Sequence, residues 1–382
     1  MNKIFKYSLR FFYNFFIYFV DSIISFDNKS LKKNTLLIVR LDAIGDFIIY
    51  ISSDNLIPKK YNGMKKILIC NQAVFELANS LQIFDEIIGI NLPQFKKNLI
   101  YRCKIIKKIM AIKSKIAIQP TFSRHFSTGD AIIRVSGANI KIGFDGDCTN
   151  QSKFFKLISD QWYSKLIRSD KLIKMERDRN HEFFEKLSNK KVKFKQYILP
   201  KLIDLNTRIF PPKRYIVICP GASSEDKCWP KERYKKLVKE IMNNFEIKII
   251  ICGSKKEKGL IKDIMKDFES EFLKDIYGKR LIEFIEILRN ALFIIGNDSS
   301  PVHIASLVKT KSICIYGGKL HKRFMPYPKD LKYAPIPVFN IECKKNNWSC
   351  SQDHNCLSKI EVEDIMKIIK SELKIYLNQI LY

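Results

Sequence analysis

Three short segments combine residue types that bind phosphates or move protons. The first is RLDAIGD at 40–46, which ends on Asp46. A carboxylate at this point could cap the start of a helix, or it could act as a general base that removes a proton from a hydroxyl group. Because Gly-Asp is a common turn, this segment by itself leaves both interpretations open.

The second segment is PGASSEDKCWP at 220–230. Gly221 gives the backbone conformational freedom, and Ser223 and Ser224 offer hydroxyl and amide groups. Lys227 places a cation just before a predicted helix start. Amides, a hydroxyl and a lysine around a helix N-terminus form a cradle for phosphate. The GxxxxGK[ST] pattern of a Walker A loop is absent. The alternative is an ordinary surface loop with a capping serine.

The third segment is GNDSSPVH at 296–303, where a predicted strand leads into a helix. Free amides at that helix start, together with Asp298, Ser299, Ser300 and His303, could bind a pyrophosphate and a ribose. The alternative is an Asp or Ser cap beside a packed histidine.

Glu257 follows the apolar run that ends at Gly253. Acidic residues in this position hold a ribose hydroxyl in other nucleotide-binding folds. The alternative is a solvated glutamate at the start of a helix.

Each of these segments follows a short apolar run that is typical of a buried strand. Strands are predicted at 36–40, 66–70, 86–90, 115–119, 215–219, 247–252, near Asp275, at 292–296 and at 312–317. Helices are predicted at 74–81, 99–112, 231–245, 255–268, 281–291 and 300–308. Alternating strands and helices indicate parallel βαβ units, whose ligands bind beyond the carboxyl ends of the strands.

The chain is expected to hold two such βα domains. The segment 150–190 looks mainly helical and charged, and 200–213, with Pro211-Pro212, is typical of a linker. A last helix is predicted from the capping-box spacing of Ser358 and Glu361 to about Leu377. The predicted parts are a helix in 1–30, a domain at 31–205, a second domain at 206–340, and a cysteine-bearing loop with the last helix at 341–382.

The segment 2–26 predicts an amphipathic helix with an aromatic stripe. The stripe contains Phe5, Leu9, Phe12, Phe16, Phe19, Ile23 and Phe26, and the other side contains Lys3, Lys6, Arg10, Asn14 and Asp21. Such a helix could lie in a membrane interface with its basic residues near lipid phosphates, or dock on the protein's own core or on a partner. A spanning helix is weakly indicated, because Arg10 and Asp21 bracket only ten residues.

The charge predicts an anionic partner. The 382 residues carry 68 Lys+Arg against 39 Asp+Glu, a formal net charge of +29. Nucleic acid, a membrane surface or a phosphorylated substrate would fit, although the general richness in Lys, Ile and Asn explains part of this excess. No helix-turn-helix, RRM or zinc-finger pattern is visible and the basic residues are spread throughout, so nucleic acid is not expected.

Ten cysteines give no secreted disulfide framework, which favours a reducing compartment. Cys219, Cys252 and Cys314 lie inside predicted strands and are expected to be buried. Cys343, Cys350 and Cys356 lie near His354, but their spacing is not the CxxC of a zinc ribbon. Reduced thiols in a surface loop are expected there, with metal binding as the alternative.

Taken in order and at this spacing, the segments resemble glycosyltransferase family 9, the ADP-heptose:lipopolysaccharide heptosyltransferase family. The resemblance rests on RLDAIGD at 40–46, PGASSEDKCWP at 220–230 and GNDSSPVHIA at 296–305, with support from IGFDG at 142–146 and RDRNHEFFEKL at 177–187. It covers about 36–318 and implies an α/β GT-B fold, in which two Rossmann-like domains face a cleft. The donor would bind the C-terminal domain and the acceptor the N-terminal domain.

The resemblance also implies roles for individual residues. By motif position, Asp46 resembles the general base and Lys227 resembles the residue that neutralises the leaving diphosphate. The other positions that match donor-binding residues of the family are Ser223, Ser224, Glu257, Asp298, Ser299, Ser300 and His303. Ser300 stands where the family commonly has glycine, which leaves the identity of the donor open.

The resemblance therefore implies an inverting glycosyltransferase that needs no catalytic metal and no cofactor. It would move a heptose, or a related sugar, from an ADP-sugar to a lipopolysaccharide or lipooligosaccharide core or another surface glycan. The acceptor would be lipid-linked or an oligosaccharide, and the enzyme would be cytoplasmic, at the inner face of the cytoplasmic membrane. The alternative is a glycosyltransferase of the same fold with another nucleotide sugar or a protein acceptor.

Overall fold

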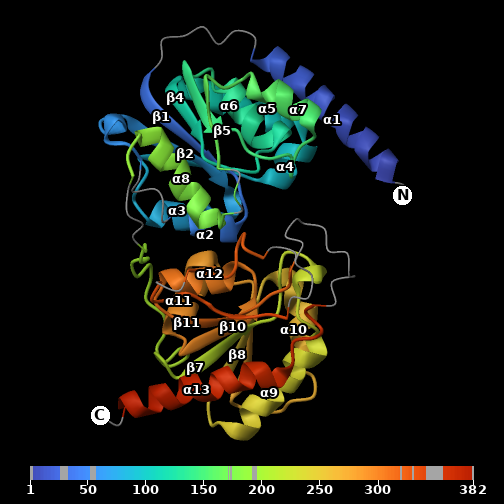
Figure 1. Ribbon diagram of the computed structural model, residues 1–382, viewed down its shortest axis with the longest axis vertical. Helices are drawn as coiled ribbons and strands as arrows, with labels where there is room; N and C mark the ends of the chain where they lie inside the picture. Colours follow the sequence, from blue (N-terminus) through green and yellow to red (C-terminus); the bar gives the residue numbers. More distant parts are fainter. Residues whose placement is uncertain are drawn as a thin grey trace. The chain divides into compact units, whose positions relative to one another are not determined.

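The computed structural model describes residues 3–25, 33–51, 57–170, 172, 174–191, 196–318, 321–328, 331–340 and 356–380. The chain forms two compact units (Figure 1). Unit 1 comprises Met1–Leu172 and Arg177–Phe194, and unit 2 comprises Ile173–Glu176 and Lys195–Tyr382. Each unit contains one six-stranded sheet in which every strand pair is parallel.

The sheet of unit 1 has the order β3-β2-β1-β4-β5-β6. Its strands are β1 (Lys33–Arg40), β2 (Lys65–Asn71), β3 (Glu86–Ile90), β4 (Ser114–Gln119), β5 (Ile140–Phe144) and β6 (Lys165–Ile167). The central strand β1 contains the run Leu-Leu-Ile-Val, which is buried completely because helices cover both faces of a parallel sheet. This strand places the 40–46 segment at the carboxyl edge of the sheet.

Helices pack on the two faces of this sheet. In Figure 1, α1, α5, α6 and α7 gather on one side of the strands, and α2 and α8 lie on the other. The helical elements of unit 1 are α1 (Lys3–Ile24), α2 (Ile44–Ile51), η2 (Lys59–Tyr61), η3 (Gln72–Val74), α3 (Phe75–Ser80), α4 (Leu92–Lys97), α5 (Leu99–Ile112), the π-helical turn η4 (Phe126–Asp130), α6 (Ala131–Val135), α7 (Lys153–Asp160) and α8 (Glu176–Ser188).

Unit 2 repeats this topology with the order β12-β11-β10-β7-β8-β9. Its strands are β7 (Tyr215–Cys219), β8 (Lys248–Gly253), β9 (Leu273–Tyr277), β10 (Phe293–Asn297), β11 (Lys311–Ile315) and β12 (Ile336–Val338). Because β8, β7 and β10 are neighbours, the turns that follow these three strands leave the same edge of the sheet. These turns contain all the donor-binding residues predicted for this half of the chain.

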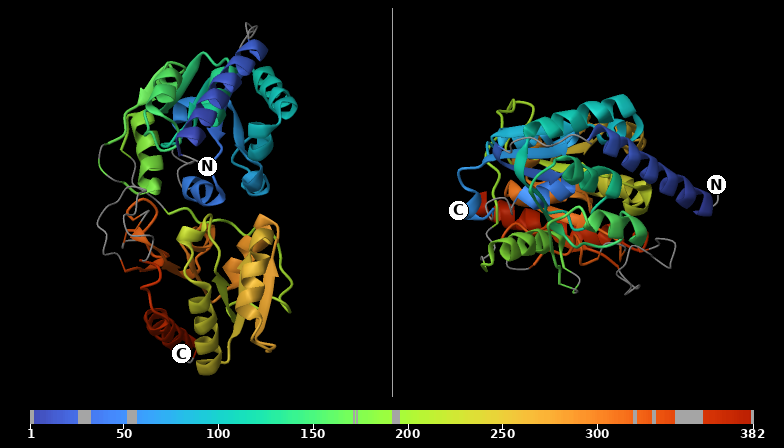
Figure 2. Two further views of the ribbon diagram at one scale, coloured as in Figure 1. Left: turned by 90° about the vertical axis from the view of Figure 1, so that its right-hand side faces the viewer. Right: turned by 90° about the horizontal axis from the view of Figure 1, so that it is seen from above.

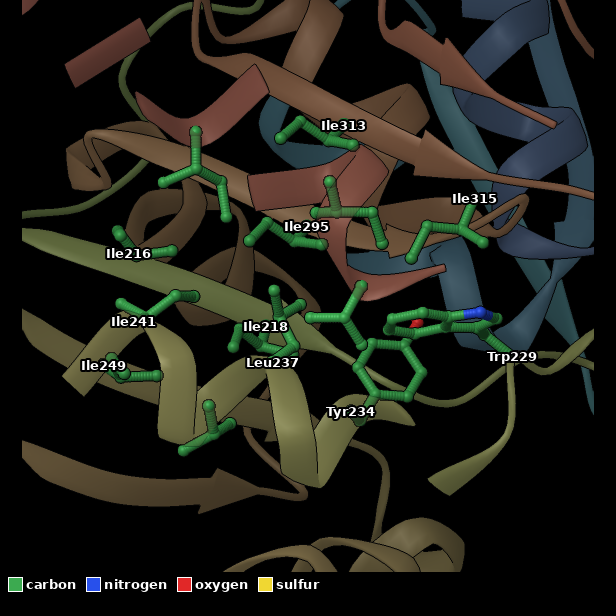
Figure 3. Packing of buried hydrophobic residues seen from close by; sticks show 14 of the residues in the cluster. Ile216, Ile218, Trp229, Tyr234, Leu237, Ile241, Ile249, Ile295, Ile313 and Ile315 are labelled. Carbon is green, nitrogen blue, oxygen red and sulfur yellow. The ribbon is translucent and has the colours of Figure 1, made fainter. Parts of the chain in front are cut away.

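The helical elements of unit 2 are η5 (Glu225–Lys227), α9 (Lys231–Asn244), η6 (Lys255–Glu257), α10 (Lys258–Met265), α11 (Leu281–Asn290), α12 (Ser300–Leu307) and α13 (Val362–Ile380). Three of them, α9, α10 and α13, bury a large apolar cluster against the sheet. Residues of α9, α10 and α13 pack on the side chains of β7, β8, β10 and β11, and Figure 3 shows Trp229 and Tyr234 beside Ile218 in this cluster. The cluster supports the turn that contains Lys227.

The strands predicted for the two sheets are present, but three further strands were missed. Two of them, β6 and β12, lie at sheet edges and are only three residues long. β12 contains Pro337, which a sheet tolerates at its edge, and β6 interrupts the segment that was predicted to be mainly helical. The third, β5, coincides with the IGFDG motif.

The predicted amino-terminal helix is present, and its polar side faces the protein. Asn14 and Asp21 are buried, whereas Phe12 and Phe19 of the aromatic stripe are exposed. Asp21 pairs with arginines of unit 1, so α1 does not dock on the core of unit 1 through its aromatic stripe. Phe26 lies outside the described residues. Among the helices that are described, none is long and apolar enough to cross a membrane.

The carboxyl-terminal helix begins later than the capping-box spacing predicts. Helix α13 starts at Val362, and Glu361 forms an ion pair with Arg233 of α9. Cys219, Cys252 and Cys314 are buried free thiols, as expected. Cys343, Cys350 and His354 lie outside the described residues, while the Cys356 thiol accepts a hydrogen bond from the Gly318 N–H. The described part of the chain contains no group of three His, Cys, Asp or Glu residues that could hold a metal ion.

Candidate active site

One buried side chain joins two turns of unit 2. Asn297, the last residue of β10, is 0% exposed, and its Nδ2 donates to the carbonyl oxygens of Pro220 at 2.7 Å and Gly221 at 3.4 Å. Its Oδ1 accepts from the Trp229 backbone N–H at 2.9 Å and from the Tyr234 hydroxyl at 3.0 Å. Asn297 therefore fixes both ends of the 220–230 segment to the start of the 298–303 segment.

The Tyr234 hydroxyl remains protonated and therefore donates its hydrogen bond to Asn297. Burial raises the pKa of the Tyr234 phenol well above its usual value, so the hydroxyl stays protonated at neutral pH. The Trp229 ring lies edge-on to the Tyr234 ring at 5.0 Å, and its Nε1 donates to the Ile360 carbonyl at 3.0 Å. The tryptophan of the motif is therefore a structural anchor under the loop.

Two helices that start at this edge have no side-chain cap. Helix α9 begins after Pro230 and α12 begins after Ser299, and neither residue makes a capping hydrogen bond with its side chain. Ser299 donates instead to the Gly221 carbonyl at 3.4 Å. The first backbone N–H groups of these helices are therefore not occupied by a serine or aspartate cap, and such groups are suited to bind an anion.

His303 is a buried histidine that pairs with Asp298. His303 Nε2 lies 3.3 Å from Asp298 Oδ1, and both side chains are nearly buried. The other ring nitrogen, Nδ1, lies 3.0 Å from the Tyr327 hydroxyl, and the two rings stack at 5.9 Å. Contacts on both nitrogens hold the imidazole in one orientation at the start of α12.

Glu257 lies against the turn that follows β7. Its carboxylate accepts a hydrogen bond from the Ser254 N–H and so caps η6. A Cβ atom on Gly221 would lie 1.6 Å from Glu257 Oε1, so the carboxylate occupies the space that only a glycine leaves open. Glu257 is thus both a helix-start residue and a neighbour of the 220–230 segment.

Lys227 and the two serines lie on the outer part of the same loop. Lys227 ends η5 and is half-buried, and within the described residues its ammonium group makes no ion pair. Ser223 and Ser224 are exposed, and the Ser224 carbonyl accepts from the Lys227 N–H at 3.1 Å. The loop thus presents a cation and two hydroxyl groups close to the start of α9.

Unit 1 has its own polar cluster where the strand order reverses, between β1 and β4. Arg40 Nε lies 2.7 Å from Asp42 Oδ2, and Arg40 also donates to the Pro120 carbonyl at 3.2 Å. The Thr121 hydroxyl donates to the same Asp42 oxygen at 3.2 Å. In open parallel sheets this reversal point is where ligands bind. Asp46 lies next to this cluster in the chain, in the first turn of α2.

The structure therefore brings together Glu257, Asp298, Ser299, Ser300 and His303 with the loop of Ser223, Ser224 and Lys227 at one edge of unit 2. Asp46 lies in unit 1. Sequence reasoning missed Asn297, Arg40 and Asp42. Their positions in the sequence could have identified these three residues. Each lies at or beside the end of a central strand, inside the 40–46 or the 296–303 segment.

Comparison with known proteins supports a family assignment. A family model described as glycosyltransferase family 9 (heptosyltransferase) matches residues 130–350, which is more than half of the chain. Lipopolysaccharide heptosyltransferase 3 of Escherichia coli is 29% identical over 154 residues, or 40% of this chain and 44% of that protein. Lipopolysaccharide heptosyltransferase 1 of Campylobacter coli is 29% identical over 177 residues, or 45% of this chain and 50% of that protein. The chain thus aligns with about half the length of these relatives.

The fold has close structural parallels. The structure of Escherichia coli ADP-heptose LPS heptosyltransferase II superimposes with a TM-score of 0.67 at 15% identity, covering 89% of this chain and 98% of that one. This likeness, together with the two parallel sheets, identifies the GT-B fold. With the family model matched across most of unit 2, these findings show that the protein belongs to glycosyltransferase family 9, the heptosyltransferase family.

Proposed function

We propose that the protein transfers a heptose from ADP-heptose to the core of a lipopolysaccharide or lipooligosaccharide, or to a related surface glycan. The observation that carries this proposal is the Asn297 contact set, which joins the 220–230 loop to the start of α12 beside two uncapped helix N-termini. The names of the relatives supply the donor and acceptor classes.

In the proposed donor site, the nucleotide sugar binds to unit 2, within the donor-binding half of the chain at 206–340. The N–H groups at the starts of α9 and α12 receive the diphosphate, together with Lys227 and the hydroxyls of Ser223, Ser224, Ser299 and Ser300. Glu257 accepts a hydrogen bond from a ribose hydroxyl of the nucleoside, while Asp298 and His303 keep the start of α12 in place.

In the proposed chemical step, Asp46 of the acceptor-binding half at 31–205 removes the proton from the acceptor hydroxyl. The hydroxyl oxygen attacks the anomeric carbon and forms the new glycosidic bond, while the bond from that carbon to the diphosphate oxygen breaks. A single displacement inverts the anomeric configuration. The negative charge that develops on the departing ADP is met by Lys227 and the two helix N-termini, so this mechanism does not call for a metal ion.

The proposed acceptor is anionic and is anchored to lipid, which places the reaction at the inner face of the cytoplasmic membrane. The net charge of +29 supports this, because a diffuse basic surface attracts both a phosphorylated glycolipid and the membrane that contains it.

Ser300 favours a second candidate, which is a transferase of the same fold with a different nucleotide sugar. Ser300 is the first residue of α12, where the family resemblance led us to expect glycine, and a side chain there narrows the approach to the helix start. Calorimetry distinguishes the two candidates. Binding of ADP with no heat from UDP or GDP, and loss of ADP binding in Lys227→Ala, supports ADP-heptose, whereas the reverse preference supports the second candidate.

A further inference from the structure

Helix α1 packs on unit 1 through its polar side. Asn14, Ile17 and Asp21 are at most 3% exposed, and they recur at the spacing of one helix face. Asp21 accepts a hydrogen bond from Arg102 Nε at 2.7 Å and pairs with Arg102 Nη2 at 2.5 Å. Both side chains of this ion pair are fully buried. The pair therefore fixes which side of α1 turns inward.

Further polar contacts hold α1 in this rotation. Arg134 of α6 donates to the Ser22 hydroxyl at 2.7 Å and to the Tyr18 carbonyl at 3.2 Å. The Tyr13 hydroxyl donates to the Lys96 carbonyl on α4. Rotation of the helix would leave Asp21 and two arginines buried without these partners, which is costly. The outward face of α1 is therefore set by polar contacts on its inner face.

That outward face is a continuous apolar stripe. Phe12, Phe16 and Phe19, together with Leu9 and Ile23, are 50–69% exposed. The stripe continues onto α7 through the Phe11 ring, which lies 6.0 Å from the Phe12 ring and 5.5 Å from the Phe154 ring. Phe154 and Leu157 are also exposed. We call Phe12, Phe15, Phe16, Phe19, Phe154 and Leu157 the aromatic face. Scattered exposed apolar residues are ordinary, but a contiguous patch of this kind marks an interaction site.

The surroundings of the aromatic face favour an anionic surface as the partner. Lys153 on α7 and Lys97 on α4 are exposed, and these helices are the neighbours of α1. A second copy of the chain would bring two molecules of charge +29 together, whereas an anionic bilayer attracts each of them. In Figure 1 and in the right-hand view of Figure 2, the amino-terminal turns of α1 extend past the other helices of unit 1.

We infer that the aromatic face lies in the head-group region of a bilayer that contains anionic lipids, with α1 parallel to the membrane. Phenylalanine side chains enter the boundary between head groups and acyl chains, and the flanking lysines contact lipid phosphates. The buried Asp21–Arg102 pair stays within the protein, so α1 lies on the membrane as part of unit 1. This inference rests on the proposed function, because a lipid-anchored acceptor would be delivered to the same unit.

Vesicle co-sedimentation tests this inference with the full chain. Two vesicle types are used, phosphatidylcholine alone and phosphatidylcholine mixed with phosphatidylglycerol, and neither contains acceptor. We expect the wild-type protein to bind the mixed vesicles and to lose affinity in high salt. We expect the double variant Phe12→Ser/Phe16→Ser to bind about tenfold more weakly or worse, since it removes two large apolar side chains from the bilayer.

The matched control is Ile209→Ser/Phe272→Ser, which removes two exposed apolar side chains from unit 2 and should bind as the wild type does. Three results would overturn the inference: no binding of the wild type to mixed vesicles, unchanged binding of the Phe12/Phe16 variant, or a wild-type dimer in analytical ultracentrifugation that this variant abolishes. The last result would assign the face to a second copy.

A parallel assay separates this inference from the proposed function. Transfer to a delipidated oligosaccharide acceptor in solution should be the same in the wild type and in the Phe12/Phe16 variant. If transfer fails in both while vesicle binding behaves as expected, the proposed function is wrong and the membrane face stands. If transfer is normal and vesicle binding is absent, the membrane face alone is wrong.

Discussion

Asn297 holds Trp229 in place: its side-chain oxygen accepts a hydrogen bond of 2.9 Å from the Trp229 backbone N–H. The same side chain binds the Pro220 carbonyl, so one residue at the end of β10 determines the shape of the loop that contains Lys227. This relationship explains why an asparagine and a tryptophan occur in two separate motifs. It also makes the loop sensitive to a substitution that touches no ligand.

Replacing Asn297 by alanine should damage both stability and donor binding. The change removes the Asn297 partner of the Trp229 N–H, the Tyr234 hydroxyl and the Pro220 carbonyl, and each such loss costs roughly 1–3 kcal/mol. We expect a lower denaturant midpoint and weaker ADP binding by calorimetry. Asn244→Ala, which removes a single hydrogen bond from an exposed asparagine, is the control and should change neither measurement. Unaltered ADP affinity in a folded Asn297→Ala protein would contradict the positioning role.

Gly221 and Glu257 should behave as a coupled pair. A Cβ atom at Gly221 would overlap Glu257 Oε1, so Gly221→Ala should destabilise unit 2 by about 1–3 kcal/mol through overpacking. In Gly221→Ala/Glu257→Ala the overlap is gone, and the double variant should be more stable than the sum of the single effects predicts. Urea unfolding of all four proteins measures this coupling, and strict additivity would contradict the close approach.

The alkylation rates of the cysteine thiols can be measured without any substitution, and they test both the buried strands and, through Cys228, the donor loop. Burial raises the pKa of Cys70 to about 12 and raises the pKa values of Cys219, Cys252 and Cys314, so these four should resist alkylation in the folded protein at mildly alkaline pH. Cys148, which is exposed, should react first.

Cys228 is half-buried beside Lys227, and burial raises its pKa as well. It should be labelled slowly, and ADP should slow the labelling further, as followed by peptide mass spectrometry. Labelling of Cys228 at the same rate with saturating ADP would place the nucleotide elsewhere.

The buried pair of Asp21 and Arg102 should be important for stability. Asp21→Asn leaves Arg102 and Arg134 without their carboxylate, and breaking a buried ion pair costs about 3–5 kcal/mol. Glu86→Gln, which removes an exposed partner of Lys65, should cost about 0–1 kcal/mol. Denaturant unfolding compares the two, and equal effects would mean that α1 does not dock through Asp21.

The strand pattern was predictable because central parallel strands are continuous apolar runs. Leu36–Val39 and the run at 215–219 could be recognised without any long-range information. The edge strands β6 and β12 could not be recognised in this way. A strand of three residues is identified by its pairing with the neighbouring strand and not by an apolar pattern of its own.

The orientation of α1 was not predictable for a related reason. Periodicity assigns an apolar face to a helix, but it contains no information about a buried arginine far along the chain that can pair with Asp21. The candidate site was predictable in its residue types. The central position of Asn297 was not, because it depends on which turns meet across β7 and β10.

The most direct test of the account is transfer itself, measured by mass spectrometry of the acceptor after incubation with ADP-heptose. The wild-type protein should add one heptose to a core oligosaccharide. Asp46→Asn should bind ADP normally yet be slower by about 10²–10⁴-fold, because only the proton acceptor is lost. Transfer at the wild-type rate by Asp46→Asn would contradict the proposed base, and a wild-type enzyme that uses a UDP- or GDP-sugar but not ADP-heptose would contradict the central claim.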